Sequence, residues 1–345
     1  MAGSGSTVDE KSTAEDDVVL EVRNLVQEFA VTNPKGKIRK GRVSALADVS
    51  LALRRGETFA IVGETGSGKS TMARAIIGEP PPLSGEIYIN GKGLAQLNKT
   101  ERRSARRAVQ MVFQDPFSAL NPRWTVEKLV SEPLVIQRIG TSRDRQQRVN
   151  EILSRVGLDP SRYLDRYPRD LSGGECQRLA IARALILSPD VVMCDEPVTA
   201  LDVYIQAQIL NLLADLRDQL HLTYLLIAHD LTVVQALSHR LATMYLGKLC
   251  EVGPTDLVFE RPAHPYTAAL LSAVPPRPGL PNLRAPIELT GEIPSPIDPP
   301  SGCRFHTRCP IAQQICAVVD PTATDIGEDR SVMCHFPLEI GGPRK

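Results

Sequence analysis

The stretch that decides the fold of this chain reads Gly63-Glu64-Thr65-Gly66-Ser67-Gly68-Lys69-Ser70, followed by Thr71. The apolar run at residues 58–62 predicts a strand before it, and residues 71–77 carry a helical pattern after it. A glycine-rich turn in this setting lets successive backbone N–H groups point toward one anion, and the helix N-terminus adds its positive dipole. The Lys69 ammonium would then reach the β- and γ-phosphates of ATP, and the Ser70 hydroxyl would ligate Mg²⁺.

A pair of acidic residues supplies the remaining chemistry of phosphate transfer. The apolar run at residues 191–194 predicts a buried strand, and it ends in Asp195-Glu196. We expect Asp195 to support Mg²⁺ and Glu196 to polarise the attacking water. Two acids at a strand end could instead cap a helix, but the phosphate-binding loop upstream favours the catalytic interpretation.

Strand and helix patterns alternate along most of the chain. Further strands are predicted at residues 18–23, 49–53, 86–90 and 224–228, and residues 115–171 are mostly helical in pattern. A segment rich in Gly and Lys/Arg at residues 33–42 is expected to be an exposed loop. This alternation predicts an α/β fold with a largely parallel sheet. Pro and Gly become denser beyond Gly253, where we place a domain boundary.

Composition argues against several classes of protein. Lys+Arg and Asp+Glu are 40 each, so the formal net charge is zero, unlike that of a protein built mainly to bind nucleic acid. No apolar run approaches the roughly 18 residues that suggest a membrane span. The polar, acidic segment 1–17 lacks the apolar stretch of a signal peptide. We therefore expect a disordered tail at residues 1–17 and a cytosolic protein whose membrane role comes through partner subunits.

The sequence Leu171-Ser172-Gly173-Gly174-Glu175 resembles the signature motif of the ABC ATPases. Other positions match motifs of that family in the expected order, namely Phe29 for the aromatic that stacks on adenine, Gln114 for the Q-loop, Asp202 for the D-loop and His229 for the switch histidine. The resemblance covers residues 18–253. It implies an ABC-type P-loop domain with a RecA-like core, a small antiparallel β region and a helical subdomain at residues 115–171.

The same resemblance implies roles for the matching residues. Gln114 would contact Mg²⁺ and the attacking water, and His229 would contact the γ-phosphate. A helix that begins with Ser-Gly-Gly is an anion-binding surface, so residues 172–175 would cap the ATP bound to a second ATPase subunit in a head-to-tail dimer. Glu175 stands where glutamine is common and brings a negative charge near that nucleotide.

Three stretches resemble the oligopeptide/dipeptide importer branch of the family: residues 114–123, residues 196–203 and His264-Pro265-Tyr266-Thr267. The branch implies ATP hydrolysis that powers import of di- or oligopeptides at the cytoplasmic face of the cell membrane. Its partners would be a second homologous ATPase, two permease subunits and an extracytoplasmic solute-binding protein, without nucleic acid. Nickel, glutathione or another small solute is an alternative cargo. A soluble ABC ATPase outside transport is the alternative from a different class.

Four of the seven cysteines, Cys303, Cys309, Cys316 and Cys334, lie in the segment 254–345, which we predict to be a small Pro- and Cys-rich extension. No CxxC pair is present, so an ordinary zinc ribbon fits poorly. The extension has little apolar sequence to hold it together, which suggests a metal centre instead. The pattern, including Cys309-Pro310, resembles the [4Fe–4S] motif of the branch. Zn²⁺ is the second choice and unligated thiols are the third.

Overall fold

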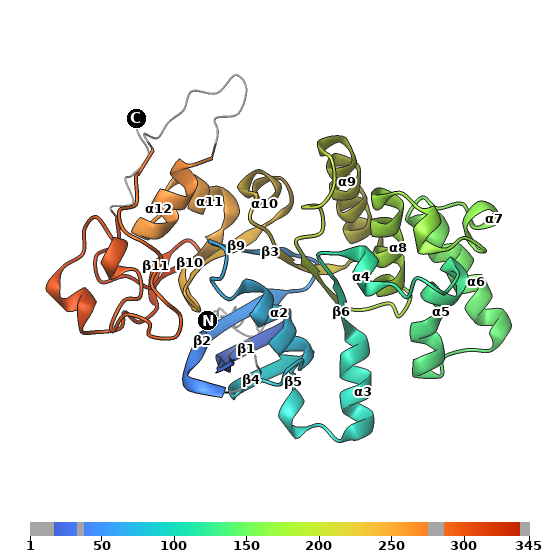
Figure 1. The fold of residues 1–345 in the computed structure, drawn as a ribbon, viewed down its shortest axis with the longest axis horizontal. Coiled ribbons are helices and arrows are strands. Elements are labelled where there is room, and N and C mark those ends of the chain that lie inside the picture. Colours follow the sequence, from blue (N-terminus) through green and yellow to red (C-terminus); the bar gives the residue numbers. More distant parts are fainter. Residues whose placement is uncertain (1–16, 33–37, 275–285, 339–345) are drawn as a thin grey trace, which may run out of the picture.

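The fold is built on two sheets of very different size, shown in Figure 1 for a computed structural model that describes residues 17–32, 38–274 and 286–338. The larger sheet has eight strands in the order β11 (Thr324–Gly327), β12 (Arg330–Val332), β10 (Lys248–Pro254), β9 (Arg240–Tyr245), β3 (Thr58–Val62), β8 (Thr223–Ile227), β7 (Val191–Asp195) and β6 (Val109–Val112). The smaller sheet is antiparallel, in the order β2 (Ile38–Arg54), β1 (Val18–Thr32), β4 (Ser84–Ile89) and β5 (Lys92–Gly93).

Helices fill the connections between these strands. The α-helices are α2 (Lys69–Ile77), α3 (Lys99–Ala108), α4 (Pro116–Ala119), α5 (Val126–Gln137), α6 (Ser142–Arg155), α7 (Pro160–Tyr163), α8 (Gly173–Leu185), α9 (Val203–Leu220), α10 (Leu231–Leu237), α11 (Thr255–Glu260) and α12 (Pro265–Ser272). Short 3₁₀ turns lie at η1 (Leu94–Gln96), η2 (Pro168–Asp170), η3 (His306–Arg308) and η4 (Gln314–Ala317). Among the described residues, no helix is both long and apolar enough to cross a membrane.

Strand β3 shows why the large sheet forms where it does. All its residues are buried, as expected of a parallel strand covered on both faces. Because side chains alternate between faces, Phe59 and Ile61 join the apolar core that includes α2 and the small sheet. Ala60 and Val62 join a second core with residues of α5, α6, α8 and α9. Strands β9, β3, β8, β7 and β6 are mutually parallel, so the predicted α/β fold is confirmed.

The helical part of the chain forms largely where its pattern indicates. Helices α4 to α7 all lie within residues 115–171, and Figure 1 shows α5, α6 and α7 beside α8 at one end of the molecule. Thr125 and Thr141 cap α5 and α6 by accepting backbone N–H groups of the first turn. Pro133 lies inside α5 rather than ending it. Leu129 and Leu153 are fully buried against α8.

The expected loop at residues 33–42 is partly wrong, because β2 begins at Ile38 and pairs with β1. Cross-strand pairing stabilises this segment, and no local periodicity in the sequence reports it. Residues 33–37 lie outside the described part of the chain, as do residues 1–16 of the expected tail. The strands β9 and β10, which complete the sheet beside β3, are additional to those predicted.

The C-terminal hairpin of β11 and β12 extends the large sheet, because β12 pairs with β10. Arg330 of this hairpin forms a fully buried ion pair with Glu251 of β10, with 2.7 Å between Nη2 and Oε1. Glu251 also accepts the backbone N–H groups of Ala263 and His264. A buried charge needs such partners, so this pair ties the C-terminal segment to the sheet. The domain division at Gly253 stays a prediction.

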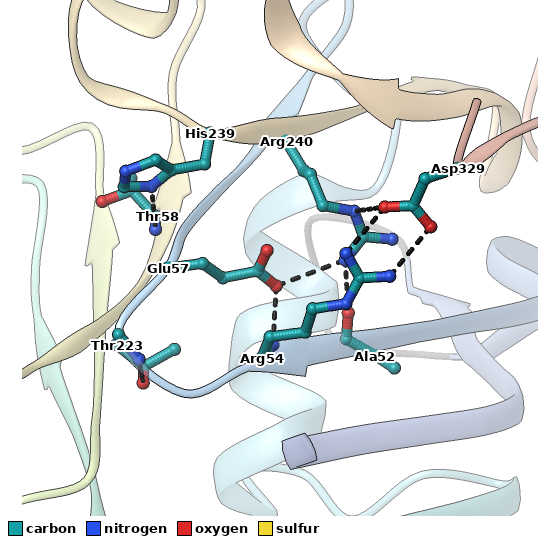
Figure 2. Close-up of polar contacts among 9 residues, drawn as sticks. Ala52, Arg54, Glu57, Thr58, Thr223, His239, Arg240 and Asp329 are labelled. Atoms are coloured by element: carbon teal, nitrogen blue, oxygen red, sulfur yellow. Dashed lines mark hydrogen bonds and ion pairs between the residues drawn. The ribbon is translucent and has the colours of Figure 1, made fainter. Parts of the chain in front are cut away.

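A second polar cluster ties the same hairpin to the β2–β3 turn (Figure 2). Asp329 accepts two hydrogen bonds from Arg54, of 2.7 and 2.8 Å, and lies 3.2 Å from Nε of Arg240. Arg240 in turn donates to Glu57 over 3.3 Å. Bidentate contacts of this kind fix geometry as well as charge. The cluster therefore joins three segments that are far apart in the sequence.

The packing of the C-terminal segment also buries the titratable side chain of His264. Its side chain caps α12 by accepting the Tyr266 N–H over 3.0 Å, and only 1% of the residue is exposed. Burial lowers the pKa of His264 to about 3, so the ring is neutral in the folded protein. Since the unfolded histidine has a pKa of about 6.5, the unfolded chain binds more protons between these values. This contribution to stability is therefore lost as the pH falls below about 6.5.

We predict that His264→Asn, which keeps a capping oxygen, makes the free energy of unfolding less sensitive to acid. Between pH 7 and pH 5 the wild type should lose about 2 kcal/mol more stability than the variant. Denaturant unfolding at several pH values measures this difference, and His221→Asn, at the exposed end of α9, is the matched control. Parallel pH profiles of wild type and His264→Asn would contradict the assignment.

Candidate functional site

The predicted catalytic residues come together at one edge of the large sheet. The glycine-rich loop follows β3, Gln114 follows β6, Glu196 follows β7 and His229 follows β8. These four strands are parallel, so their carboxyl ends meet at the same edge, where α/β proteins bind their ligands. The sheet thus assembles the site from four separate parts of the chain.

Close backbone packing shapes the glycine-rich loop. A Cβ atom at Gly63 would lie 2.1 Å from the Met244 carbonyl oxygen, and one at Gly68 would lie 2.4 Å from that of Ala45. Both glycines also have positive φ angles, of 156° and 106°. No other residue fits these two positions, so the predicted glycine pattern has a steric cause.

The loop has the features of an anion site. The hydroxyl of Ser67 is buried without a hydrogen-bond partner among the described residues, and a Cβ at Gly66 would meet no atom within 4 Å. Lys69 lies at the start of α2, and its Nζ donates to the carbonyl oxygens of Gly63 and Glu64 over 2.7 and 3.0 Å. Burial lowers the pKa of Lys69, while nearby carboxylates, first Glu196, oppose the shift. These residues therefore fit the phosphates of ATP.

The expected metal ligands lie beside the loop. Ser70 Oγ donates to Asp195 Oδ1 over 2.9 Å, and Asp195 is 4% exposed. Burial raises the pKa of Asp195, and the hydrogen bond from Ser70 opposes that shift. A hydroxyl and a carboxylate are oxygen ligands that suit Mg²⁺. Thr71 follows in the first turn of α2. The metal role of Ser70 and Asp195 stays a prediction.

Glu196 lies at the centre of the residues that the sequence predicts to be hydrolytic. Its Oε2 accepts a hydrogen bond from Gln114 Nε2 over 2.8 Å and lies 3.5 Å from His229 Nδ1. Thr199 also donates to this oxygen over 3.3 Å. The backbone of Glu196 has a φ of 48°, which is uncommon outside glycine, and its N–H donates to the Ile227 carbonyl. The structure thus brings together Gln114, Glu196 and His229, and their catalytic roles stay a prediction.

The signature residues begin helix α8. Ser172 and Glu175 form a capping box, in which the Glu175 carboxylate accepts the Ser172 N–H and hydroxyl over 2.7 and 2.8 Å. The Tyr163 hydroxyl also donates to Glu175 and lowers the pKa of its carboxyl. A Cβ at Gly174 would lie 2.7 Å from the side chain of Ile205 in α9. The charge of Glu175, which distinguishes this signature, is therefore held at its own helix N-terminus.

Two further expected contacts lie outside this group. Asp202 caps α9 by accepting the Ile205 N–H over 3.0 Å, at the point where the D-loop ends. Gly173 packs near Leu201 of the same loop, with 3.2 Å from a hypothetical Cβ. Phe29 lies in β1 opposite Val43 and is 36% exposed. The stacking of adenine on Phe29 stays a prediction.

The prediction of an iron–sulfur cluster is wrong. Cys303, Cys309, Cys316 and Cys334 line one small cavity of about 10 Å³, and all four are free. Within the described ranges, however, no group of three or more His, Cys, Asp or Glu side chains could hold a metal ion. The same part of the chain gives no support for zinc, the second choice. Burial raises the pKa of Cys303, Cys309 and Cys334, the last to about 11, which favours neutral thiols.

Other contacts hold the C-terminal segment in place of a metal. Phe305 is 2% exposed and packs on Tyr245 and Tyr266, with ring centroids 5.2 and 5.4 Å away. The Cys303 N–H donates to the Cys316 carbonyl over 2.8 Å. The segment has few apolar residues, but one deeply buried aromatic ring contributes as much as several small side chains.

Three residues near the site were not predicted: Tyr163, Thr199 and Arg308. Thr199 lies within a stretch that had been recognised, but its contact with Glu196 depends on the turn after β7. Arg308 is distant in the sequence and forms an ion pair with Glu64 of the phosphate-binding loop, 2.9 Å from Oε2. No local pattern reports such a pairing.

These features define a class of protein: an ATP-binding cassette, a nucleotide hydrolase whose signature helix lies apart from its own phosphate-binding loop. Solved structures agree. A dimeric, post-hydrolysis form of the cassette MJ0796, bound to ADP and Pi, is 30% identical, covers 68% of this chain and 98% of that chain, and has a TM-score of 0.60. The cassette cbiO1 from Clostridium perfringens is 28% identical, covers 71% of this chain and 91% of that chain, and also has a TM-score of 0.60.

Sequence comparisons narrow the class. The family model of ABC transporters matches residues 46–199, and that of the oligopeptide/dipeptide transporter C-terminal region matches residues 250–316. The oligopeptide transport ATP-binding protein AppF of Bacillus subtilis is 44% identical, over 94% of this chain and 99% of the relative. OppF of Escherichia coli is 47% identical, over 88% of this chain and 92% of the relative. The chain belongs to the ABC transporter ATPases, in their oligopeptide/dipeptide branch.

We predict that Lys69→Ala weakens binding of MgATP roughly a hundredfold, because it removes the charged donor of the loop. Calorimetric titration of the full chain measures the affinity. Lys128→Ala, on the exposed face of α5, is the control and should bind as the wild type does. Unchanged affinity in Lys69→Ala would move the phosphates away from this loop.

For Glu196→Gln we expect retained MgATP binding and a loss of turnover of about 10²-fold or more, because the amide cannot accept a proton from water. Steady-state hydrolysis in the assembled transporter measures this. Glu151→Gln, on the exposed side of α6, tests whether loss of a carboxylate elsewhere has the same effect. Wild-type turnover in Glu196→Gln would assign water activation to another group.

Proposed function

We propose that this chain binds and hydrolyses ATP to drive import of di- or oligopeptides through partner permease subunits. The observation that carries the proposal is the junction of two features in one chain. A hydrolytic site with Glu196 between Gln114 and His229 is followed by a segment, 250–316, that matches the oligopeptide/dipeptide transporters. The named relatives are oligopeptide or di/tripeptide transport proteins, which supports peptides as the cargo.

The chemistry follows from the positions of the side chains. Lys69 and the loop N–H groups would bind the β- and γ-phosphates of ATP, and Ser70 and Asp195 would hold Mg²⁺, which would draw charge from the phosphate oxygens. Glu196 takes a proton from the attacking water as the new P–O bond forms and the bond to the ADP oxygen breaks. Gln114 orients Glu196 through the 2.8 Å hydrogen bond, and His229, whose Nδ1 lies 3.5 Å from Glu196 Oε2, would contact the γ-phosphate.

A second ATPase subunit completes the site in this proposal. The signature at the start of α8 lies among the helices at one end of the molecule, whereas α2 lies near its middle (Figure 1). In the assembled transporter, residues 172–175 would then face a neighbouring subunit rather than their own loop. Val203 and Tyr204, directly after the D-loop, are 82% and 72% exposed, which suits an apolar contact with that neighbour. Closure on ATP and reopening on hydrolysis would transmit work to the permeases.

The partners and location follow from the same proposal. Two permease subunits and an extracytoplasmic solute-binding protein would form the transporter with this chain, at the cytoplasmic face of the membrane. We propose residues 18–253 as the nucleotide-binding domain and 254–345 as its C-terminal extension. The ATPase does not contact the solute, so the cargo is argued from the relatives alone.

Purification from membranes tests this proposal. We expect the tagged chain to co-purify with two permeases and one homologous but distinct ATPase, and the mass of the intact complex gives the stoichiometry. Peptide-stimulated hydrolysis in the presence of the binding protein should exceed basal hydrolysis. A complex with two copies of this chain would contradict the paired-ATPase part, and purification without permeases would contradict transport.

A further inference from the structure

The C-terminal segment contacts the phosphate-binding loop directly through Tyr266 and Arg308. We propose that these are positioning residues for the loop: Tyr266 fixes its backbone and Arg308 neutralises Glu64, so that residues beyond β10 set the affinity for MgATP. The inference rests on the nucleotide site proposed above. It gives the C-terminal segment a part in the ATP reaction, although none of its residues lies among the predicted catalytic groups.

Tyr266 acts on the loop backbone. Its hydroxyl accepts the N–H of Glu64 over 2.9 Å, and the residue is 0% exposed. Glu64 is the second residue of the loop, directly after Gly63, whose carbonyl accepts from Lys69. A satisfied N–H holds its peptide plane, so the Tyr266 hydroxyl fixes the start of the turn that presents the following N–H groups.

Arg308 acts on the loop charge. Its Nη1 lies 3.1 and 2.9 Å from the two carboxylate oxygens of Glu64 and 3.3 Å from the Tyr245 hydroxyl. The side chains of Arg308 and Glu64 are only 9% and 24% exposed, so water screens them weakly. An unpaired carboxylate in a loop that binds triphosphate would repel the ligand. Arg308 removes that repulsion before ATP arrives.

The two contacts rest on a firmly packed base. Tyr245, Tyr266 and Phe305 are each at most 2% exposed, and the ring centroids of the two tyrosines are 4.9 Å apart. The turn after Tyr245 is hydrogen-bonded to the phosphate-binding loop, because the Gly247 N–H donates to the Ser67 carbonyl over 2.7 Å. Arg304 donates to the Leu246 carbonyl in the same turn. Side chains held in this way can position the loop within the narrow tolerance that catalysis needs.

A purely structural role of Arg308 and Tyr266 predicts different experimental results. If Arg308 only stabilised the fold, its removal would have the same effect whatever the charge at Glu64, and lysine would rescue no better than glutamine. If Tyr266 only filled the core, loss of its hydroxyl would affect MgATP affinity no more than loss of the hydroxyl of another buried tyrosine. Both distinctions are measurable in nucleotide affinity and in the split between KM and kcat.

The first test is a charge cycle on the full chain, with MgATP affinity measured by calorimetric titration. Arg308→Gln should weaken binding about tenfold in the wild-type background and less than about twofold in the Glu64→Gln background. Arg308→Lys should recover part of the loss. In the assembled transporter, Arg308→Gln should raise KM for MgATP with kcat largely kept, because Glu196 and Asp195 are untouched. An equal effect of Arg308→Gln in both backgrounds would overturn the proposal.

The second test compares two substitutions that each remove one tyrosine hydroxyl. Tyr266→Phe should weaken MgATP binding several-fold, since it leaves the Glu64 N–H without its partner. Tyr224→Phe is the matched control, because the hydroxyl of Tyr224 in β8 is buried without a hydrogen-bond partner in the described part of the chain. Equal affinities of the two variants would overturn the role of Tyr266. A wild-type chain that binds no MgATP would instead overturn the proposed function, and the inference with it.

Discussion

Close backbone packing around the phosphate-binding loop is the constraint on which the rest of the structure depends. Gly63 and Gly68 touch the carbonyl groups of Met244 and Ala45, so the loop lies wedged between the end of β9 and strand β2. This close packing fixes the path of the loop backbone, and the N–H groups of Glu64 and Ser67 are held by the Tyr266 hydroxyl and the Glu64 carbonyl. The position of the loop therefore also depends on the residues that pack on the turn after β9. The same close packing therefore pre-organises the loop and couples it to the segments that pack against it.

The acidic residues of the site show how the sheet holds groups that repel one another. Asp195 and Glu196 follow each other at the end of β7, and burial already disfavours the charge of Asp195. Ser70 and Gln114 each donate to one of these carboxylates, and the backbone of Glu196 lies in the left-handed region. Such strain persists only where surrounding contacts over-determine it. The parallel strands supply those contacts.

The C-terminal segment is held by tertiary contacts rather than by ligands. Counting its apolar residues predicted a segment too weak to fold alone, and an iron–sulfur cluster was inferred to compensate for this. The stabilising partners lie elsewhere in the chain: Glu251 neutralises Arg330, and the rings of Tyr245 and Tyr266 enclose Phe305. The cysteines line a cavity within this packing. A local shortage of apolar residues is therefore poor evidence for a metal, because burial is a property of the whole fold.

The sequence by itself determined the α/β fold and the order of the nucleotide motifs, and it predicted the residues of the hydrolytic group that the sheet brings together. Those signals are local: a glycine pattern with a steric cause, apolar runs of strand length, and acids at a strand end. Only the tertiary structure decided that β12 extends the sheet, that Thr199 contacts Glu196, and that Tyr266 and Arg308 contact the loop at Glu64. The Thr199 contact depends on the turn after β7. The other contacts join residues up to 244 positions apart, and no periodicity along the chain encodes a pairing between such distant segments.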